Sequence, residues 1–223
     1  MSRKRKAFIT GGGRGIGAAI AKELARRGFE IWAPVRAELD LADPASIKRF
    51  TEAHRADVDV LVNNAGINFL KAIPELDSAV WMQMQQVNLA APLALIQWAV
   101  PFMREHAWGR ILNISSIFGI VTKEKRSAYS MTKAALNALT RSAAVEFGPD
   151  GVLVNSLCPG YVDTEMTSRN NSPADLEKIK SAIPLRRLAV PEELASVAGF
   201  LCSEENNYIT GQAVVADGGF SCQ

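Results

Sequence analysis

Short apolar runs alternate along this chain with longer segments that have helical periodicity. Runs that are apolar on both faces and separated by helices are typical of a parallel sheet covered on both sides. The runs are Ala7 to Thr10, Glu30 to Val35, Val58 to Val62, Arg110 to Ile114, Val152 to Leu157 and Ala213 to Ala216. We therefore predict an α/β fold built on a doubly wound parallel sheet.

The segments between the runs carry helix signals. Ile16, Ile20 and Leu24 recur at four-residue intervals, which predicts a helix with one buried stripe. Longer helices are predicted for Ser78 to His106, Ser127 to Phe147 and a segment after Pro191. Pro92 and Pro101 would bend or restart the first of these.

One connection in this pattern is too short for a helix. Arg36 to Leu41 reads as another strand directly after Val35, whereas a parallel crossover takes roughly a dozen residues. We predict that the crossover helix is absent between Val35 and Leu39, that the strand beyond is rudimentary, and that the sheet is abridged between its second and third strands.

Composition narrows the class of protein. The 25 Lys and Arg against 23 Asp and Glu leave a net charge of +2, which gives no electrostatic footprint for nucleic acid. The apolar stretch after the basic start, Met1 to Lys6, is too short for a secretory signal, and no window approaches the ~20 apolar residues of a membrane span. Three scattered cysteines suit neither a disulfide framework nor a metal site. We expect one cytoplasmic domain over residues 1–223.

A glycine cluster stands between the first run and the first helix. Its sequence is Thr10-Gly11-Gly12-Gly13-Arg14-Gly15-Ile16-Gly17. Glycines there permit positive φ and close approach of the backbone to a pyrophosphate, and the helix N-terminus attracts anions. A P-loop would close with Gly-Lys-Ser/Thr, so ATP and GTP are disfavoured. Taken alone, the cluster is equally explained as a flexible turn.

Tyr129 and Lys133 are four residues apart, which places them on one face of a helix. A phenol with a pKa near 10 exchanges protons poorly at neutral pH, but an adjacent ammonium lowers that pKa. The pair is therefore a candidate general acid/base, although taken alone a Tyr/Lys pair at this spacing is usually part of a solvated surface.

Together these motifs resemble the short-chain dehydrogenase/reductase family. The glycine cluster has that family's T-G-x-x-x-G-I-G spacing, and the other motifs follow in the family's order: Asn63-Asn64-Ala65-Gly66, Gln86-Val87-Asn88-Leu89, Asn113-Ile114-Ser115-Ser116 and Tyr129-Ser130-Met131-Thr132-Lys133. The match runs from Ala7 to Phe220. The resemblance implies a Rossmann-type fold and hydride transfer between a carbonyl and its alcohol with a nicotinamide cofactor.

The resemblance also assigns catalytic roles. Tyr129 would be the general acid/base, Ser116 would hold the substrate oxygen, and Lys133 would bias the phenol and bond the nicotinamide ribose. Asn88 would support a water chain to Lys133. The alternatives are a helix cap or turn for the serines and an asparagine bonded to backbone for Asn88.

Cofactor choice depends on the end of the second strand. Val35 and Arg36 stand where NAD users carry a carboxylate, and Arg36 with Arg14 could pair with the extra phosphate of NADP. NADP(H) is favoured and NAD(H) is possible, since Arg36 could also be a surface residue. The cofactor-binding residues implied by resemblance are Gly11, Gly13, Arg14, Gly15, Ile16, Gly17, Arg36, Asp40, Leu41, Asn64, Ala65, Gly66, Tyr129, Lys133, Pro159, Gly160, Val162 and Thr164.

In the resemblance, Asp40 holds the adenine edge, Asn64 lies along the ribose, and Val162 with Thr164 grips the carboxamide. The substrate pocket would be largely apolar, with Phe118, Ile120, Tyr161, Met166 and Ile183, under a lid formed by residues 164–183. The charged loop Thr122 to Arg126 could recruit an anionic substrate, or could be a solvated or subunit-contact loop.

The segments Pro184 to Leu188 and Tyr208 to Gln212 resemble the 3-oxoacyl carrier-protein reductases. Ala107 and Asp150 stand where those enzymes are expected to carry basic residues, so we expect a small free ketone, aldehyde or secondary alcohol and keep the carrier-protein substrate as an alternative. A non-catalytic NADP-sensing regulator is an alternative of another class. The resemblance implies a homotetramer or homodimer formed through the Ser78 to His106 and Ser127 to Phe147 helices.

Overall fold

Six parallel strands form one sheet in residues 3–222, the part of the chain that this computed structural model describes; Met1 and Ser2 of the basic start and Gln223 lie outside it. The strand order is β2-β1-β3-β4-β5-β6. The strands are β1 (Lys6–Ile9), β2 (Glu30–Trp32), β3 (Val60–Asn63), β4 (Gly109–Ile114), β5 (Val152–Pro159) and β6 (Ala213–Ala216). Each strand coincides with one of the predicted apolar runs, so the α/β fold with a parallel sheet is confirmed.

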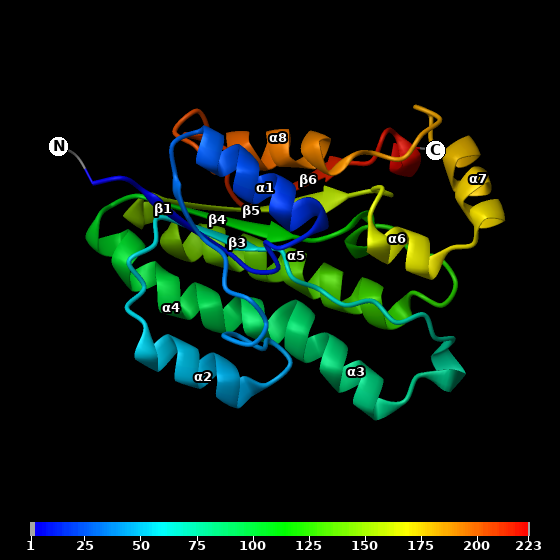
Figure 1. The fold of residues 1–223 in the computed structure, drawn as a ribbon, viewed down its shortest axis with the longest axis horizontal. Coiled ribbons are helices and arrows are strands. Elements are labelled where there is room, and N and C mark those ends of the chain that lie inside the picture. Colours follow the sequence, from blue (N-terminus) through cyan, green and yellow to red (C-terminus); the bar gives the residue numbers. More distant parts are fainter. Residues whose placement is uncertain (1–2, 223) are drawn as a thin grey trace.

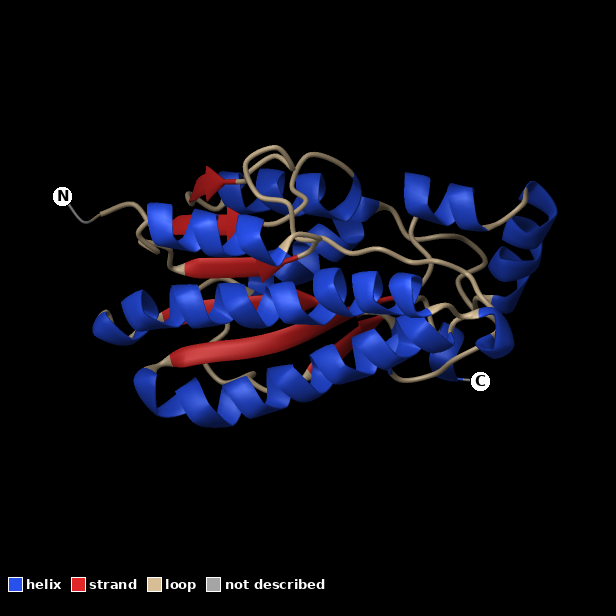
Figure 2. Cartoon of the chain, turned by 90° about the horizontal axis from the view of Figure 1, so that it is seen from below, coloured by secondary structure: helices blue, strands red, loops and turns tan. Residues whose placement is uncertain are grey.

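Helices cover both faces of the sheet (Figure 1). Helices α1 (Gly15–Arg26) and α8 (Pro191–Leu201) lie on one face. Helices α2 (Pro44–Ala53), α4 (Ala91–Glu105) and α5 (Ser127–Phe147) lie on the other, and Figure 2 shows this second layer in front of the strands. Phe8 and Ile9 are both fully buried, one in each layer, because neighbouring strand residues point to opposite faces. The doubly wound arrangement is therefore as predicted.

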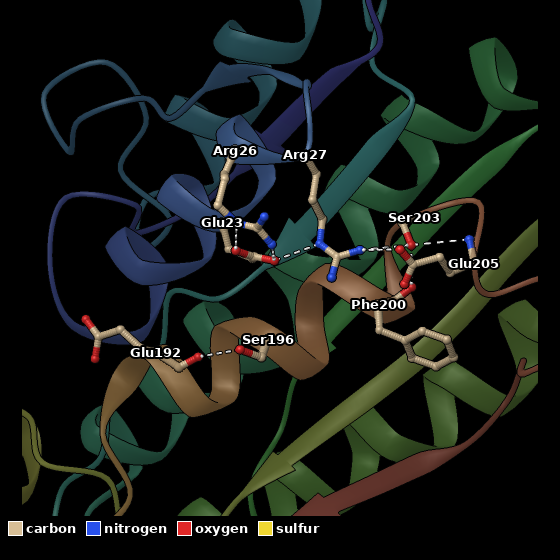
Figure 3. A network of polar contacts seen from close by, with 8 residues as sticks. All are labelled: Glu23, Arg26, Arg27, Glu192, Ser196, Phe200, Ser203 and Glu205. Atoms are coloured by element: carbon tan, nitrogen blue, oxygen red, sulfur yellow. Dashed lines mark hydrogen bonds and ion pairs between the residues drawn. The ribbon is translucent and has the colours of Figure 1, made fainter.

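Helices α1 and α8 pack closely, and an ion pair joins the end of α1 to the loop that follows α8. Arg27 Nε donates to Glu23 Oε1 at 2.7 Å, and Arg27 Nη1 donates to Glu205 Oε1 at 3.1 Å (Figure 3). Arg26 and Arg27 hold the pKa of Glu23 down at about 2. A Cβ on Gly199 would lie 2.6 Å from Arg27 Nε, so a larger residue there would require the Arg27 or Glu23 side chain to shift.

The connection from β2 to β3 differs in part from expectation. No helix forms between Val35 and Leu39, as predicted, and the amides of Glu38 and Leu39 both donate to the Val35 carbonyl in a turn. The predicted rudimentary strand over residues 36–41 was wrong, because these residues form no strand. Leu39 and Leu41 are instead buried against the α2 and α4 layer.

Helix α2 makes the crossover to β3 and was missed in the sequence. Its signals were present: Asp43 caps the helix by accepting from the Ala45 amide at 2.9 Å, and Pro44 occupies the first turn. Ile47 and Phe50 form its buried stripe. Because the chain forms no strand between β2 and this helix, β2 is the edge strand, and the sheet ends one strand earlier than expected.

The predicted helix from Ser78 to His106 is interrupted by a wider turn. It consists of α3 (Ser78–Gln85), a π-helical segment (Gln86–Ala90) and α4. Pro92 lies in the first turn of α4 and Pro101 lies inside it. The π segment adds a backbone offset that turns Val87 and Asn88 into the interior.

The expectation that no window of the sequence approaches a membrane span was wrong, because one helical span is long enough and apolar enough by length and composition. The span Ser78–Glu105 is 28 residues long, and its most apolar window has a mean hydropathy of 1.2. Half of that window is buried inside the fold, as in the core helix of a soluble protein. Length and composition alone are therefore weak evidence of a membrane segment here.

The remaining elements lie mainly at the carboxyl ends of the strands. Helices α6 (Glu165–Asn170) and α7 (Pro173–Ala182) follow β5 and stand beyond that edge of the sheet (Figure 1). Ser172 and Asp175 form a capping box that begins α7. The 3-10 turns are Ile73–Glu75, Ile117–Gly119, Gly148–Asp150 and Phe220–Cys222.

Candidate active site

Four sequence motifs meet at one edge of the sheet. The glycine cluster follows β1, Asn64 follows the end of β3, Ser115 and Ser116 follow β4, and Gly160 follows β5. Because the strands are parallel and adjacent, their carboxyl ends lie side by side. The fold therefore brings together residues that are far apart in the sequence.

The glycine cluster forms a turn with an open side. Gly11 and Gly15 have φ of +65° and +53°, in the left-handed region that favours glycine. A Cβ on Gly17 would lie 2.3 Å from the Gly11 carbonyl oxygen, so α1 begins directly against the turn. A Cβ on Gly13 would meet no atom within 4 Å. The turn thus has one packed side and one free side.

The N-terminus of α1 is suited to an anion. Arg14 is the N-cap residue but makes no side-chain capping hydrogen bond, and the first turn of α1 contains no acidic residue. Helix N-termini carry partial positive charge and unpaired amides. The free side of the glycine turn and this helix end therefore fit a pyrophosphate group.

Asn64 holds the glycine turn in place. Its Nδ2 donates to the carbonyl oxygens of Thr10 at 2.9 Å and Gly11 at 3.1 Å. In return, the Thr10 hydroxyl accepts from the amides of Asn64 and Ala65 at 3.0 and 3.1 Å. The position of Asn64 along the ribose stays a prediction, but the structure shows a second role, in which Asn64 joins the ends of β1 and β3. Sequence reasoning missed the part of Thr10 in this contact.

The two arginines chosen for the adenine end are exposed and paired. The Arg36 side chain is 78% exposed and donates to Asp40 Oδ2 through Nε at 3.2 Å and Nη2 at 3.1 Å. Arg14 forms an ion pair with Glu165 of α6. The hydrogen bond from the Ala42 amide lowers the pKa of Asp40, and the hydrogen bond from Arg36 lowers it further. Both guanidiniums are thus engaged with carboxylates and accessible to solvent.

The four predicted catalytic side chains are all buried. Asn88, Lys133, Ser116 and Tyr129 are 1%, 3%, 7% and 9% exposed. Lys133 Nζ donates to the Ile114 carbonyl at 2.8 Å and lies 5.6 Å from the centre of the Tyr129 ring. Helix α5 therefore presents Tyr129 and Lys133 together to the end of β4.

Asn88 connects the π segment to the chain after β3. Its Oδ1 accepts from the Ile67 amide at 2.9 Å, and its Nδ2 donates to the Ile67 carbonyl at 2.9 Å and to Thr132 Oγ1 at 3.1 Å. A Cβ on Gly66 would lie 3.3 Å from Asn88 Oδ1 and 3.5 Å from Lys133 Nζ. The backbone partner foreseen as an alternative is present, but it belongs to the neighbouring segment and not to the helix of Asn88.

The two serines after β4 have different partners. Ser115 Oγ donates to the Lys133 carbonyl at 3.2 Å, which ties β4 to α5. Ser116 Oγ accepts from the Phe118 amide at 3.1 Å and caps the 3-10 turn Ile117–Gly119. Ser116 also lowers the pKa of Tyr129, so its hydroxyl faces that phenol. The choice of Ser116 over Ser115 as the catalytic serine stays a prediction.

Burial controls the protonation of the Tyr129 and Lys133 pair. Loss of hydration raises the pKa of Tyr129 to about 12, against the opposing effects of Ser116 and the Arg126 guanidinium. Loss of hydration also lowers the pKa of Lys133 to about 8. The expectation that a neighbouring ammonium lowers the tyrosine pKa is therefore not met, because desolvation raises that pKa more than the neighbouring groups lower it. At neutral pH the phenol is protonated.

Replacement of Lys133 by methionine tests this burial. Between pH 8 and 10.5 the unfolded chain keeps a proton on Lys133 that the folded protein has lost, so the wild type gains stability as pH rises. The free energy of unfolding of the wild type, relative to that of K133M, should therefore rise by about 3 kcal/mol across that interval. Urea unfolding of both proteins below pH 8 and near pH 10.5 measures it, and a constant gap would contradict a lowered pKa.

An apolar cluster surrounds the Tyr129 ring. The ring of Phe118 lies 6.4 Å from that of Tyr129 and 6.0 Å from that of Tyr161. Ile179 and Ile183, from α7 and its C-terminal end, are buried in the same cluster. The other predicted pocket residues, Ile120 and Met166, are 53% and 40% exposed and lie outside it.

Three further residues reach this cluster; Phe220 and Met84 were not selected from the sequence, and Arg126 was named there only as the end of the charged loop Thr122 to Arg126. Phe220, near the C-terminus, packs on Tyr161 with ring centres 5.5 Å apart, and Met84 of α3 is fully buried in the cluster. Arg126 lies over the Phe118 ring at 5.0 Å. Within residues 3–222 no group of three His, Cys, Asp or Glu side chains could hold a metal ion.

Comparisons with known proteins agree with this geometry. The family described as Enoyl-(Acyl carrier protein) reductase matches residues 33–221. The 3-oxoacyl-[acyl-carrier-protein] reductase FabG of Aquifex aeolicus is 37% identical over 95% of this chain and 95% of its own. A Beutenbergia cavernae protein described as an NAD(P)-dependent gluconate 5-dehydrogenase, with NADP bound, has a TM-score of 0.91 at 33% identity, over 98% of this chain and 97% of its own.

A second solved structure extends the comparison to another ligand. The gluconate 5-dehydrogenase of Burkholderia cenocepacia, in complex with NADP and tartrate, has a TM-score of 0.89 at 28% identity. The match covers 98% of this chain and 96% of that one. The similarity thus extends over nearly the whole length of each protein.

Proposed function

Because this chain belongs to the short-chain dehydrogenase/reductase family, whose members act on CH–OH and C=O groups, we propose that it is an NADP(H)-preferring reductase or dehydrogenase with Tyr129 as general acid/base. The observation that carries the proposal is the buried pair of Tyr129 and Lys133 on α5, with Ser116 at the end of the adjacent strand. Asn88 fixes the backbone beside them.

The residues of this chain define the proton chemistry. Ser116 would hold the substrate oxygen, and Tyr129, protonated at neutral pH because of its burial, would donate a proton to that oxygen. Lys133 is mostly an ammonium below its pKa of about 8 and would stabilise the phenolate that remains. A bound nicotinamide supplies or accepts the hydride. The surrounding apolar cluster excludes water from the reacting groups.

The cofactor fits residues already described. The glycine turn and the N-terminus of α1 would hold the pyrophosphate, and the chain from Asn64 to Gly66 would follow the ribose next to Lys133. Val162 and Thr164, after β5, would hold the carboxamide. The neighbour with NADP bound supports a nicotinamide cofactor.

The preference for NADP(H) rests on Arg36. Arg36→Glu should raise the Kd for NADPH by about tenfold or more and leave the Kd for NADH little changed, because the added carboxylate repels only the extra phosphate. Nicotinamide fluorescence during titration measures both constants. The exposed Arg49→Glu, with the same charge change, is the control. An equal loss for both cofactors would contradict this role of Arg36.

A small free carbonyl or alcohol remains the proposed substrate. Asp150 accepts from Arg104 Nε at 2.6 Å, so the arginine beside one of the expected carrier-protein positions is already paired with a carboxylate. The similarity to FabG supports the 3-oxoacyl carrier-protein reductase as the second candidate. A cofactor-sensing regulator is disfavoured because both Tyr129 and Lys133 are present.

Other parts of the proposal concern the assembly and the lid. Residues 164–183, which include α6 and α7, would act as the substrate lid, since Ile179 and Ile183 belong to the apolar cluster around Tyr129. We expect a homotetramer or homodimer formed through α4 and α5, in the cytoplasm. Size-exclusion chromatography with light scattering measures the oligomeric state.

The direct test is titration with NADPH and NADH, followed by oxidation over a panel of carbonyl compounds. Tight NADPH binding with turnover supports the proposed enzyme. Binding without turnover of any panel member would favour the regulator. Preference for NADH would contradict the proposed role of Arg36.

A further inference from the structure

Arg126 is a buried cation without a hydrogen-bond or ion-pair partner, at the edge of the apolar cluster around Tyr129. It is 4% exposed, and none of the ion pairs or side-chain hydrogen bonds found in residues 3–222 involves its guanidinium. Its Nε is shielded from solvent and unpaired. Its guanidinium lies over the face of Phe118, 5.0 Å away, and near the phenols of Tyr161 and Tyr129. Burial of a charge without compensation is costly, so this arrangement calls for a function.

The other buried arginine shows what a structural role looks like in this fold. Arg110 is 5% exposed, and its guanidinium donates to the carbonyl oxygens of Gly109, Ser203 and Asn206 at 2.8 to 3.3 Å. It fastens the loop after α8 to β4. Arg126 has no comparable set of acceptors, so its burial is not explained by holding backbone segments together.

Arg126 lies on the reactive side of α5. It is the N-cap residue of α5, three residues before Tyr129, and its guanidinium lies near enough to Tyr161 and Tyr129 for both phenols to affect its charge. Phe118 lies beside both groups, since its ring centre is 5.0 Å from the Arg126 guanidinium and 6.4 Å from the Tyr129 ring. A ligand oxygen at Tyr129 is therefore separated from Arg126 by only a short spacer.

The start of α5 adds a second unpaired donor. Ser127 Oγ is also shielded from solvent without a partner, and α5 begins with no side-chain cap and no acidic residue in its first turn. A helix N-terminus of this kind favours negative charge. The guanidinium, the hydroxyl and the helix end thus share a preference for an anion that the protein itself does not supply.

We propose that the substrate is a small oxo acid or hydroxy acid whose carboxylate pairs with Arg126 while its carbonyl or alcohol oxygen meets Tyr129. This rests on the proposed function and adds the chemical class of the substrate. A carboxylate is the group that matches the planar guanidinium through two parallel hydrogen bonds. A single buried cation beside an apolar wall also suits a group with one negative charge.

The test compares short 2-, 3- and 4-oxo acids with their methyl esters, using NADPH and the cofactor-loaded protein. The wild type should prefer the acid in at least one pair. Arg126→Gln should lower kcat/KM for that acid about 30-fold or more and change the ester little, because one partner of a buried charge pair is lost. Lys125→Gln, the adjacent and exposed lysine, removes the same charge and should leave the preference intact.

A stability measurement separates substrate binding from a structural role. Arg126→Met removes the unpaired charge at similar volume, so the melting temperature measured without added substrate should stay the same or rise. A clear fall in melting temperature, with equal loss of acid and ester turnover, would overturn the proposal.

The remaining outcomes distinguish this inference from the proposed function. If the wild type turns over neutral ketones or esters, and turns over no acid faster than its methyl ester, the proposed function stands and the carboxylate site is wrong. If nothing is turned over, the proposed function is contradicted, and titration of the NADP⁺ complex with the acids decides about Arg126. Acid binding that is weakened in Arg126→Gln supports the site, and equal binding in both proteins overturns it.

Discussion

Replacing Tyr129 by phenylalanine should lower kcat by about 10²–10⁴-fold and leave the Kd for NADPH within a few-fold of wild type. The change deletes one oxygen from a ring that is 9% exposed and packed near Phe118 at 6.4 Å, so the apolar cluster keeps its shape. Only the group that carries the transferred proton is lost. Initial rates with the best carbonyl of the panel, and fluorescence titration with NADPH, measure the two effects.

The chain offers a matched control for this substitution. Tyr208 is 93% exposed and does not belong to the apolar cluster around Tyr129, so Tyr208→Phe makes the same chemical change without touching that cluster and should keep wild-type kcat. If Tyr129→Phe retains activity near that of the control, Tyr129 is not the general acid/base. If it loses NADPH binding as well, the variant has disturbed more than the proton donor.

Gly17→Ala should destabilise the protein by about 3 kcal/mol and remove measurable nicotinamide binding. The new Cβ would lie 2.3 Å from the Gly11 carbonyl oxygen and 2.4 Å from Asn64 Nδ2. Both atoms belong to the contact that holds the glycine turn to β3, so relief of the clash must displace the turn or the start of α1. Urea unfolding and NADPH titration measure the two losses.

Gly13→Ala is the control for that clash. Its Cβ would meet nothing within 4 Å, so its free energy of unfolding should remain close to wild type. Any effect on cofactor affinity would then report the free side of the turn rather than a packing defect. If Gly17→Ala and Gly13→Ala had equal free energies of unfolding, the close contact at Gly17 would not be what excludes a larger residue there.

Much of the fold and the set of site motifs could be predicted from sequence, because the signals are local. Each strand is a short apolar run, and α5 runs from Ser127 to Phe147 as its periodicity indicates. The glycine turn and the Tyr129 to Lys133 spacing depend only on neighbouring residues and on standard helix geometry. Helix α2 was equally local and was missed because its cap at Asp43 and Pro44 was not used.

The interior contacts were decided by the tertiary structure. Asn64 and Asn88 have partners on other segments, and the pKa of Tyr129 rises because Ile179 and other distant residues bury it. Arg126 belonged to a charged loop in the sequence, and only the fold shows that it is buried and unpaired. Burial and long-range pairing depend on how separate segments pack, so the sequence determined the framework and the motifs, while packing determined their charge states and their free partners.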